Sequence, residues 1–211
     1  MDSIGFIGFD QLGKQIANQF IDSEQVIGQM VFFDDYLWQS GVSNVFSFKD
    51  YLNDEHINLS FVVALGYKHL QLKNAIISQL QLKKRTILSF IHPSCFIARG
   101  CEIKPGTIIY PMCTVDFGVS IDYGTLINNS VIISHDSMIG SCCYLSPGVV
   151  VSGKVKVGDN CFIGAGSILS DNVTIGNNVT IGIGTVVATN VPDNAFVIGN
   201  PMRIVKHIDL K

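Results

Sequence analysis

The sequence is poor in charged residues. Only 15% of its 211 residues are Asp, Glu, Lys or Arg, and the formal net charge is −3. No cluster of Lys or Arg stands out, which argues against nucleic acid or an anionic membrane surface as a partner. Because 47% of the residues are hydrophobic, much of the surface must be apolar or neutral, and we expect a broad interface between subunits.

The patterns of membrane-spanning and exported proteins are also missing. The sequence has no run of about eighteen apolar residues, and its start, MDSIGFIGF, has no basic segment before an apolar stretch. It contains six cysteines but no CxxC pair, which disfavours a disulfide framework or a zinc site. We therefore expect a cytoplasmic protein that keeps its cysteines reduced.

An aliphatic residue recurs every six positions over residues 91–187. Every member of the series is Ile, Val or Leu and no step is missed, which indicates an internal repeat. The residue two positions before each of them is always small, namely Ser, Cys, Thr or Val. The series consists of Ile91, Ile97, Ile103, Ile109, Val115, Ile121, Ile127, Ile133, Ile139, Leu145, Val151, Val157, Ile163, Leu169, Ile175, Ile181 and Val187.

A six-residue period fits neither a lone helix nor a lone strand. It predicts a coil with three flat faces per turn, in which each face is a short strand and each corner is rich in Gly, Asn and Asp. Stacking between five and six such turns buries one continuous core. We interpret the cysteines at the small position as buried apolar residues rather than ligands. These are Cys95, Cys101, Cys113, Cys143 and Cys161, and only Cys142 lies elsewhere.

Residues 1–88 follow a different pattern, in which strands and helices alternate. Strands are expected over residues 4–9, 26–33, 59–65 and 87–91, and helices over residues 11–21, 48–52 and 69–82. This alternation predicts a small parallel sheet with Rossmann-like connectivity. We therefore expect an α/β domain over residues 1–88, a β-helix over residues 89–190 and a C-terminal cap over residues 191–211.

Ligands of such sheets bind at the carboxyl ends of the strands. The first loop, residues 8–13, is not GxGxxG, so the dinucleotide fingerprint is absent. A helix N-terminus behind a glycine-bearing loop can still hold a phosphate. The acidic pair after the second strand, Asp34 and Asp35, is placed to accept hydrogen bonds from a ribose or a base. It can equally well serve only to end the strand. The candidate ligand-binding residues are Gly8, Asp10, Gly13, Asp34, Asp35 and Gly66.

The repeats VKVGDN CFIGAG SILSDN VTIGNN VTIGIG resemble the left-handed parallel β-helix of the hexapeptide acyltransferases. With the α/β domain, the FDD of residues 33–35 and the ALG of residues 64–66, the whole chain resembles sugar O- and N-acetyltransferases of the sialic-acid and bacillosamine type. The resemblance implies acetyl-CoA as co-substrate, a nucleotide-linked amino sugar held by the N-terminal domain, no metal, and a homotrimer with active sites between subunits. One departure is that relatives carry extra glycines and a His where this chain has Asp10-Gln11-Leu12.

His135 is the only His in the regular middle of the repeat, and Asp136 follows it. A corner His is usually a solvated turn residue, but the pair matches the catalytic His and acidic residue of the family. A neutral imidazole, whose ordinary pKa is about 6.5, can take a proton from the acceptor at cellular pH. Asp136 would fix its tautomer. Metal-dependent hydratases also use the left-handed β-helix, and they need three His ligands around the metal ion. Because the repeat region contains only His92 and His135, we do not expect a hydratase of this kind.

Further site residues are implied by the resemblance alone. Asn128 matches an Asn that positions the acceptor, with an ordinary turn residue as the alternative, and Tyr144 stands where relatives have a second His. The backbone N–H of Gly153 is the expected oxyanion donor. Contacts to coenzyme A are expected from Gly153, Ala165 and Gly182. Arg203 in the tail is placed to bind a phosphate of the coenzyme, or alternatively to belong to a cap of the last turn.

The expected function is acetyl-CoA-dependent N-acetylation of a dTDP- or UDP-linked 4-amino-4,6-dideoxyhexose for surface glycans. Sialic-acid O-acetylation is the nearest alternative, and small acceptors such as serine are a weaker one. A non-catalytic trimeric scaffold is the alternative from another class, because a solenoid alone proves nothing about chemistry.

Overall fold

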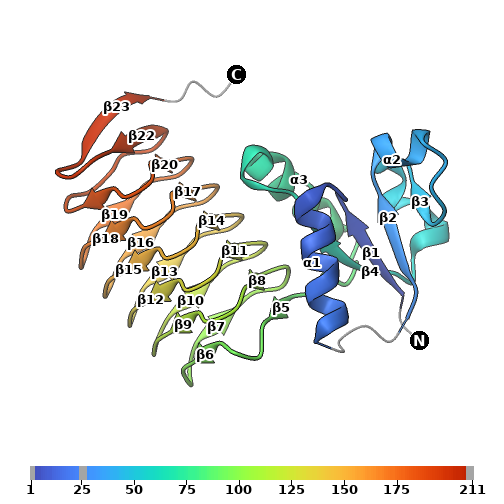
Figure 1. Cartoon of the computed structure of the whole chain (residues 1–211), viewed down its shortest axis with the longest axis horizontal. Coiled ribbons are helices and arrows are strands. Elements are labelled where there is room, and N and C mark those ends of the chain that lie inside the picture. The colour runs from blue at the N-terminus through green and yellow to red at the C-terminus, as the bar shows by residue number, and fades with distance from the viewer. Residues whose placement is uncertain (1–2, 24–27, 208–211) are drawn as a thin grey trace. The chain divides into compact units, whose positions relative to one another are not determined.

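The computed structural model describes residues 3–23 and 28–207 (Figure 1). The chain forms two compact units, Met1–Phe90 and Ile91–Lys211. In the described part, no helix has the length and apolar character needed to cross a bilayer.

The first unit is built on a four-stranded parallel sheet with strand order β3-β2-β1-β4. Three of its strands are fully apolar or nearly so, and α1 and α3 turn apolar stripes that include Ile16, Phe20 and Leu80 into the core. The predicted Rossmann-like parallel sheet is therefore confirmed. Its elements are β1 (Ile4–Ile7), α1 (Gln11–Asp22), β2 (Met30–Phe33), α2 (Asp35–Gln39), β3 (Val45–Phe46), the 3-10 helices at Phe48–Leu52, Asp54–His56 and Tyr67–His69, β4 (Ser60–Val63) and α3 (Leu70–Leu82).

Several predicted bounds are corrected. The second strand was expected from residue 26 but begins at Met30, and residues 24–27 lie outside the described part. The strand expected over residues 87–91 is a single bridge between Ile87 and Phe61, followed by β5 (Phe90–Ile91). Helix α2 and strand β3 were not predicted, since each is too short to show a period.

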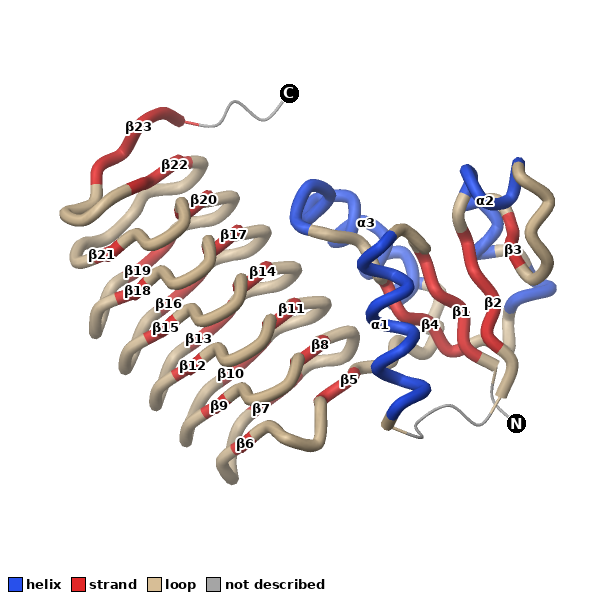
Figure 2. Tube along the Cα trace, in the orientation of Figure 1, coloured by secondary structure: helices blue, strands red, loops and turns tan. Residues whose placement is uncertain are grey.

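The second unit is a left-handed parallel β-helix of two-residue strands separated by four-residue corners (Figure 2). The second residue of each strand is a member of the predicted aliphatic series, which confirms the repeat over its whole length. The strands are β5 (Phe90–Ile91), β6 (Phe96–Ile97), β7 (Glu102–Ile103), β8 (Ile108–Ile109), β9 (Thr114–Val115), β10 (Ser120–Ile121), β11 (Leu126–Ile127), β12 (Ile132–Ile133), β13 (Met138–Ile139), β14 (Tyr144–Leu145), β15 (Val150–Val151), β16 (Lys156–Val157), β17 (Phe162–Ile163), β18 (Ile168–Leu169), β19 (Thr174–Ile175), β20 (Thr180–Ile181) and β21 (Val186–Val187).

From β6 to β18, each strand pairs in parallel with the third strand after it, so that Leu126 lies opposite Tyr144 one turn later. The result is an eight-stranded, a six-stranded and a five-stranded sheet. Each turn of the β-helix has three corners. We call the corner after a strand of the eight-stranded, six-stranded or five-stranded sheet the first, second or third corner, respectively. In one turn these are residues 128–131, 134–137 and 140–143. The expected C-terminal cap contains β22 (Ala195–Ile198), which extends the eight-stranded sheet, and β23 (Arg203–His207), which pairs antiparallel to it.

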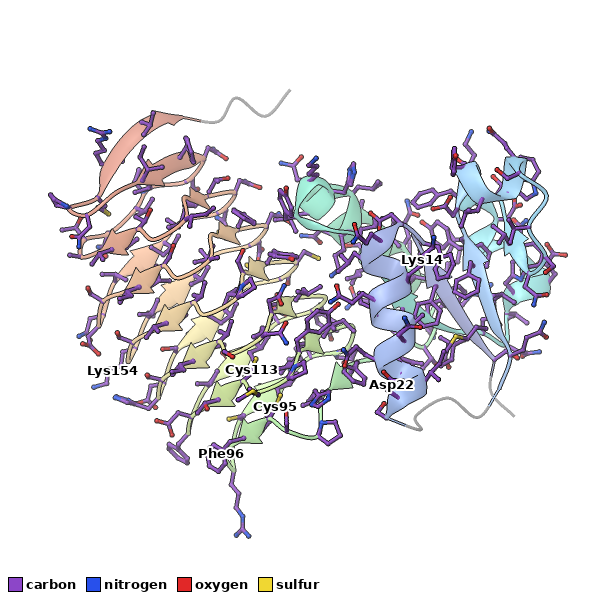
Figure 3. All side chains as sticks on the ribbon, viewed as in Figure 1. Lys14, Asp22, Cys95, Phe96, Cys113 and Lys154 are labelled. Atoms are coloured by element: carbon purple, nitrogen blue, oxygen red, sulfur yellow. The ribbon has the colours of Figure 1, made fainter. Side chains whose placement is uncertain are left out.

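The small inward residues bind the next turn by hydrogen bonds. The Thr125 hydroxyl donates to the Gly140 carbonyl at 2.7 Å, and the Cys143 thiol donates to the Gly158 carbonyl at 3.0 Å. Burial raises the pKa of Cys113 to about 11, so it stays a donating thiol at neutral pH. Cys95 and Cys113 occupy neighbouring turns (Figure 3). All six cysteines are free, but their interpretation as purely apolar residues was incomplete, because five of them donate to backbone carbonyls.

Candidate functional site

The second corner holds His135 beside a carboxylate. The corner follows β12, and the Nδ1 atom of His135 lies 3.0 Å from Oδ2 of Asp136. Since an ionised carboxylate only accepts hydrogen bonds, this pairing places the proton of a neutral imidazole on Nδ1 and leaves Nε2 as the acceptor. Both side chains are about half exposed, at 51% and 50%. The imidazole is therefore accessible and oriented to accept a proton at Nε2.

Gly153 occupies the same corner one turn later, beside Lys154, which Figure 3 labels. A β-carbon on Gly153 would lie 2.7 Å from Nε2 of His135, so only glycine leaves room next to the imidazole. Its backbone N–H donates to Oδ1 of Asp171 at 2.9 Å. The expected oxyanion donor is thus already bonded to a carboxylate, whose charge would repel an oxyanion. This geometry speaks against that role for Gly153.

The other two expected acceptor residues lie away from this corner. Asn128 belongs to the first corner, and its Nδ2 atom donates to the Tyr144 hydroxyl at 3.1 Å. The Tyr144 ring stacks on that of Phe162, with centroids 5.8 Å apart. Asn128 also accepts from the N–H of Asn129. The structure therefore joins Asn128 to Tyr144, while strand β12 separates both from His135 within one chain.

The residues expected to contact coenzyme A differ in what they can offer. Gly182 has both backbone groups engaged, because its N–H donates to Val197 and its carbonyl accepts from Ser167 and Thr185. Ala165 lies on the first corner, where its carbonyl accepts from Gly184. Arg203 begins β23 and is exposed. Gly182 is therefore poorly suited to bind a ligand through its backbone, whereas the Arg203 side chain faces solvent.

A hollow of about 410 Å³ opens in the first unit at the carboxyl ends of β1 and β2, within the usual range of roughly 300–1,000 Å³ for small-molecule sites. Two of the expected residues, Asp10 and Asp34, line it, together with Phe9, Lys14 and Tyr36. Lys14 lies on α1 (Figure 3), with its Nζ atom 5.8 Å from the centre of the Phe9 ring. Tyr36 is 80% exposed.

The acidic residues around the hollow support the local backbone. Asp10 caps α1 by accepting from the N–H groups of Leu12 and Gly13, so those helix donors are taken by a carboxylate and not left for a phosphate. Asp34 accepts from Phe9 and Leu37 and thereby joins the two loops.

Asp35 also supports the local backbone, as Asp10 and Asp34 do. It accepts from the N–H of Phe48 and the hydroxyl of Ser47, and these bonds hold its pKa below the ordinary value. Together with the bonds of Asp34, this favours the interpretation that the pair ends the strand and starts the next element.

Two of the three expected glycines of this region are required by close packing or by a left-handed backbone conformation. A β-carbon on Gly13 would lie 2.4 Å from the Gly8 carbonyl oxygen, and Gly8 itself has a φ of +87°. Gly66 is the N-cap residue of the 3-10 helix after β4, and a β-carbon there would make only an ordinary contact with Leu12, at 3.5 Å. None of these three lines the hollow. Within residues 3–23 and 28–207, no group of three or more His, Cys, Asp or Glu side chains is placed to hold a metal ion.

Sequence reasoning missed Lys14, Tyr36 and Asp171. Lys14 lies one turn into a helix that was predicted, so its proximity to the strand ends could have been inferred. Tyr36 lies in α2, which was not predicted. Asp171 follows His135 by two turns of eighteen residues, so the repeat places both residues at the same position of the same corner. The spacing alone could have shown this.

Comparison with known proteins supports this fold. The model of the bacterial transferase hexapeptide (six repeats) matches residues 154–189. No curated protein sequence matches the chain. The acetyltransferase domain of PglB from Neisseria gonorrhoeae is 23% identical with a TM-score of 0.86, over 97% of this chain and 100% of that one.

Two further structures are similar over nearly their whole length. A mutant of GDP-perosamine N-acetyltransferase from Caulobacter crescentus, in complex with CoA and GDP-perosamine, has a TM-score of 0.85 at 21% identity, covering 98% of this chain and 97% of that one. WeeI from Acinetobacter baumannii has a TM-score of 0.83 at 22% identity, covering 97% and 100%. At these identities the likeness shows a common fold.

Proposed function

We propose that this protein is an acetyl-CoA-dependent N-acetyltransferase, and that its acceptor is the amine of a nucleotide-linked 4-amino-4,6-dideoxyhexose. The observation that carries the proposal is the His135–Asp136 pair, with Nε2 facing the space beside Gly153. The similar structures support it, because one was solved with acetyl coenzyme A and another with CoA and GDP-perosamine. The nucleotide is proposed to bind at the hollow of the N-terminal unit.

The proposed reaction needs no covalent enzyme intermediate. The amine nitrogen forms a bond to the thioester carbonyl carbon, and the carbonyl electron pair moves to oxygen. Nε2 of His135 takes a proton from that nitrogen, and Asp136 stabilises the resulting imidazolium. The carbonyl then re-forms, the C–S bond breaks, and the leaving thiolate takes the proton from His135.

A thiol-release assay tests this function. Acetyl-CoA is incubated with UDP-, dTDP- and GDP-linked 4-amino-4,6-dideoxyhexoses, with free sialic acid, and with buffer alone. We expect turnover with one nucleotide-linked amino sugar, and that result also identifies the carrier. Turnover of sialic acid alone would replace the acceptor with a hydroxyl, and failure to bind acetyl-CoA at all would refute the transferase assignment.

We also propose that the active protein is a homotrimer. The outer face of the six-stranded sheet is apolar and carries Phe96, Ile132 and Ile168, which are 63%, 43% and 41% exposed. An apolar face of this kind is typical of a subunit interface. The separation of Asn128 and Tyr144 from His135 supports a site completed by a neighbouring chain, and a closed ring gives every subunit such a neighbour.

A charge in the middle of that face is expected to disrupt the trimer. The variant Ile132→Glu buries an unpaired carboxylate in the proposed interface, so we expect a smaller species in analytical ultracentrifugation and at least about a tenfold loss of activity. The matched control is Thr174→Glu, on the exposed face of the five-stranded sheet, which should leave both unchanged. A trimer of normal activity with Ile132→Glu would contradict the proposed interface.

A further inference from the structure

The space next to His135 is bounded by a second carboxylate. A β-carbon on Gly153 would lie 2.7 Å from Nε2 of His135 and 3.2 Å from Oδ1 of Asp171. The two atoms therefore border the same space beside Gly153, and an amine nitrogen that donates to both would do so at an ordinary hydrogen-bond length of about 2.9 Å to each. The side chains come from the turns before and after Gly153, and all three residues lie on the second corner.

The charge of Asp171 is not needed for the turn that it stabilises. Asp171 accepts from the Gly153 N–H at 2.9 Å, and at the third corner Asp159 accepts from Ser141 at 2.7 Å in the same way. There, Asn177 makes the equivalent bond to the N–H of Asp159 at 2.8 Å with a neutral amide. An amide oxygen can therefore make the same hydrogen bond in this turn. What distinguishes Asp171 is that its carboxylate faces the candidate general base.

A carboxylate at this place suits an amine rather than a hydroxyl. When an amine attacks a thioester, its nitrogen gains a positive charge until a proton leaves, whereas an alcohol loses its proton as it attacks. A fixed negative charge next to the attacking nitrogen stabilises that state. The bond to Gly153 uses one of about four acceptor sites of the carboxylate, so further acceptor capacity remains.

We propose that Asp171 is an acceptor-binding residue that holds the amino group of the substrate against Nε2 of His135. This inference rests on the proposed function and adds to it the group that selects amines over hydroxyls. The amine binds between the two side chains, and its developing charge is balanced by Asp171 while His135 takes the proton. The Gly153 N–H keeps Asp171 in place. This role explains why the N–H donates to a carboxylate and is not left to donate to an oxyanion.

The variant Asp171→Asn tests the proposal, since it removes the charge and keeps an oxygen for the Gly153 N–H. We expect kcat/KM for the amino sugar to fall about 10- to 100-fold, with the KM for acetyl-CoA and the melting temperature close to wild type. The matched control, Asp159→Asn, makes the same change at the third corner and should leave kcat/KM within about twofold. Asp171→Asn activity within that range, or equal losses in both variants, would overturn the proposal.

A measurement on the wild-type protein covers the case in which Asp171→Asn does not fold. The analogue with a hydroxyl in place of the amine is used as an inhibitor, and we expect it to bind at least about tenfold more weakly than the amino sugar. Equal binding would overturn the role of Asp171. Absence of N-acetylation by the wild-type protein would instead refute the proposed function itself, so the two failures are distinct.

Discussion

Replacing His135 with alanine is expected to lower kcat about 10²- to 10⁴-fold, the usual contribution of a positioned general base. The imidazole is half exposed and its Nδ1 atom bonds only to the exposed carboxylate of Asp136, so its removal opens no cavity in the core. The oligomer and the melting temperature should stay unchanged. Initial rates of thiol release at saturating substrates measure kcat, and sedimentation reports the assembly.

The matched control for this variant is His92→Ala. His92 lies at the start of the β-helix on the first corner, where its Nδ1 atom contacts the Ser94 hydroxyl at 2.8 Å. Losing it should leave kcat within a few-fold of wild type. Activity of His135→Ala within the same range would show that His135 is not the base. If the protein is a non-catalytic scaffold, neither the His135→Ala nor the His92→Ala variant will transfer acetyl groups.

The β-helix could be predicted nearly completely because its repeat fixes both the faces and the register. A slip of one residue would remove the aliphatic series from the core, so only one register buries all of its members. The same logic explains why the N-terminal unit was predicted less well. Its missed elements, α2 and β3, are five and two residues long, too short for a period to show.

The candidate site was predicted where its parts are adjacent in sequence and, through the family resemblance, at Gly153 one turn later. His135 and Asp136 are neighbours, and their pairing follows from that. Asp171 is not a neighbour, yet it lies two eighteen-residue turns away, so a sequence written in rows of eighteen would have placed it next to Gly153. The repeat therefore contained this contact, although the hydrogen bond that occupies the Gly153 N–H could not be seen without coordinates.

The carboxylates of the N-terminal unit have a local structural explanation that the sequence analysis did not weigh fully. Position at a strand end suggested ligand binding for Asp10, Asp34 and Asp35, but Asp10 and Asp34 each stand one residue before a helix. Asp is a preferred N-cap residue, and this local signal describes their hydrogen bonds better than the general rule for ligand sites does. Besides Asp10 and Asp34, the hollow is lined by the cationic Lys14, the aromatic Phe9 and Tyr36, and by Gln11 and Leu37.

Replacing Gly153 with alanine is expected to abolish most of the activity while the protein stays folded. The new β-carbon would lie 2.7 Å from Nε2 and 2.9 Å from Cε1 of His135, and 3.2 Å from Oδ1 of Asp171. All three are ends of side chains, so the imidazole can move aside at little cost in stability. A displacement of about 1 Å at a reacting group can lower the rate about 10²-fold, and we expect a loss of at least that size in kcat.

The control, Gly158→Ala, should give the reverse pattern. A β-carbon on Gly158 would meet the backbone of the next turn, at 2.8 Å from the Gly176 carbonyl carbon and 2.9 Å from the Asn177 nitrogen. Backbone of a packed coil cannot yield as a side chain does, so this variant should lower the melting temperature but keep the activity of the folded fraction. Retained activity in Gly153→Ala would show that the space beside His135 is not where the acceptor reacts, because that space is what the methyl group fills.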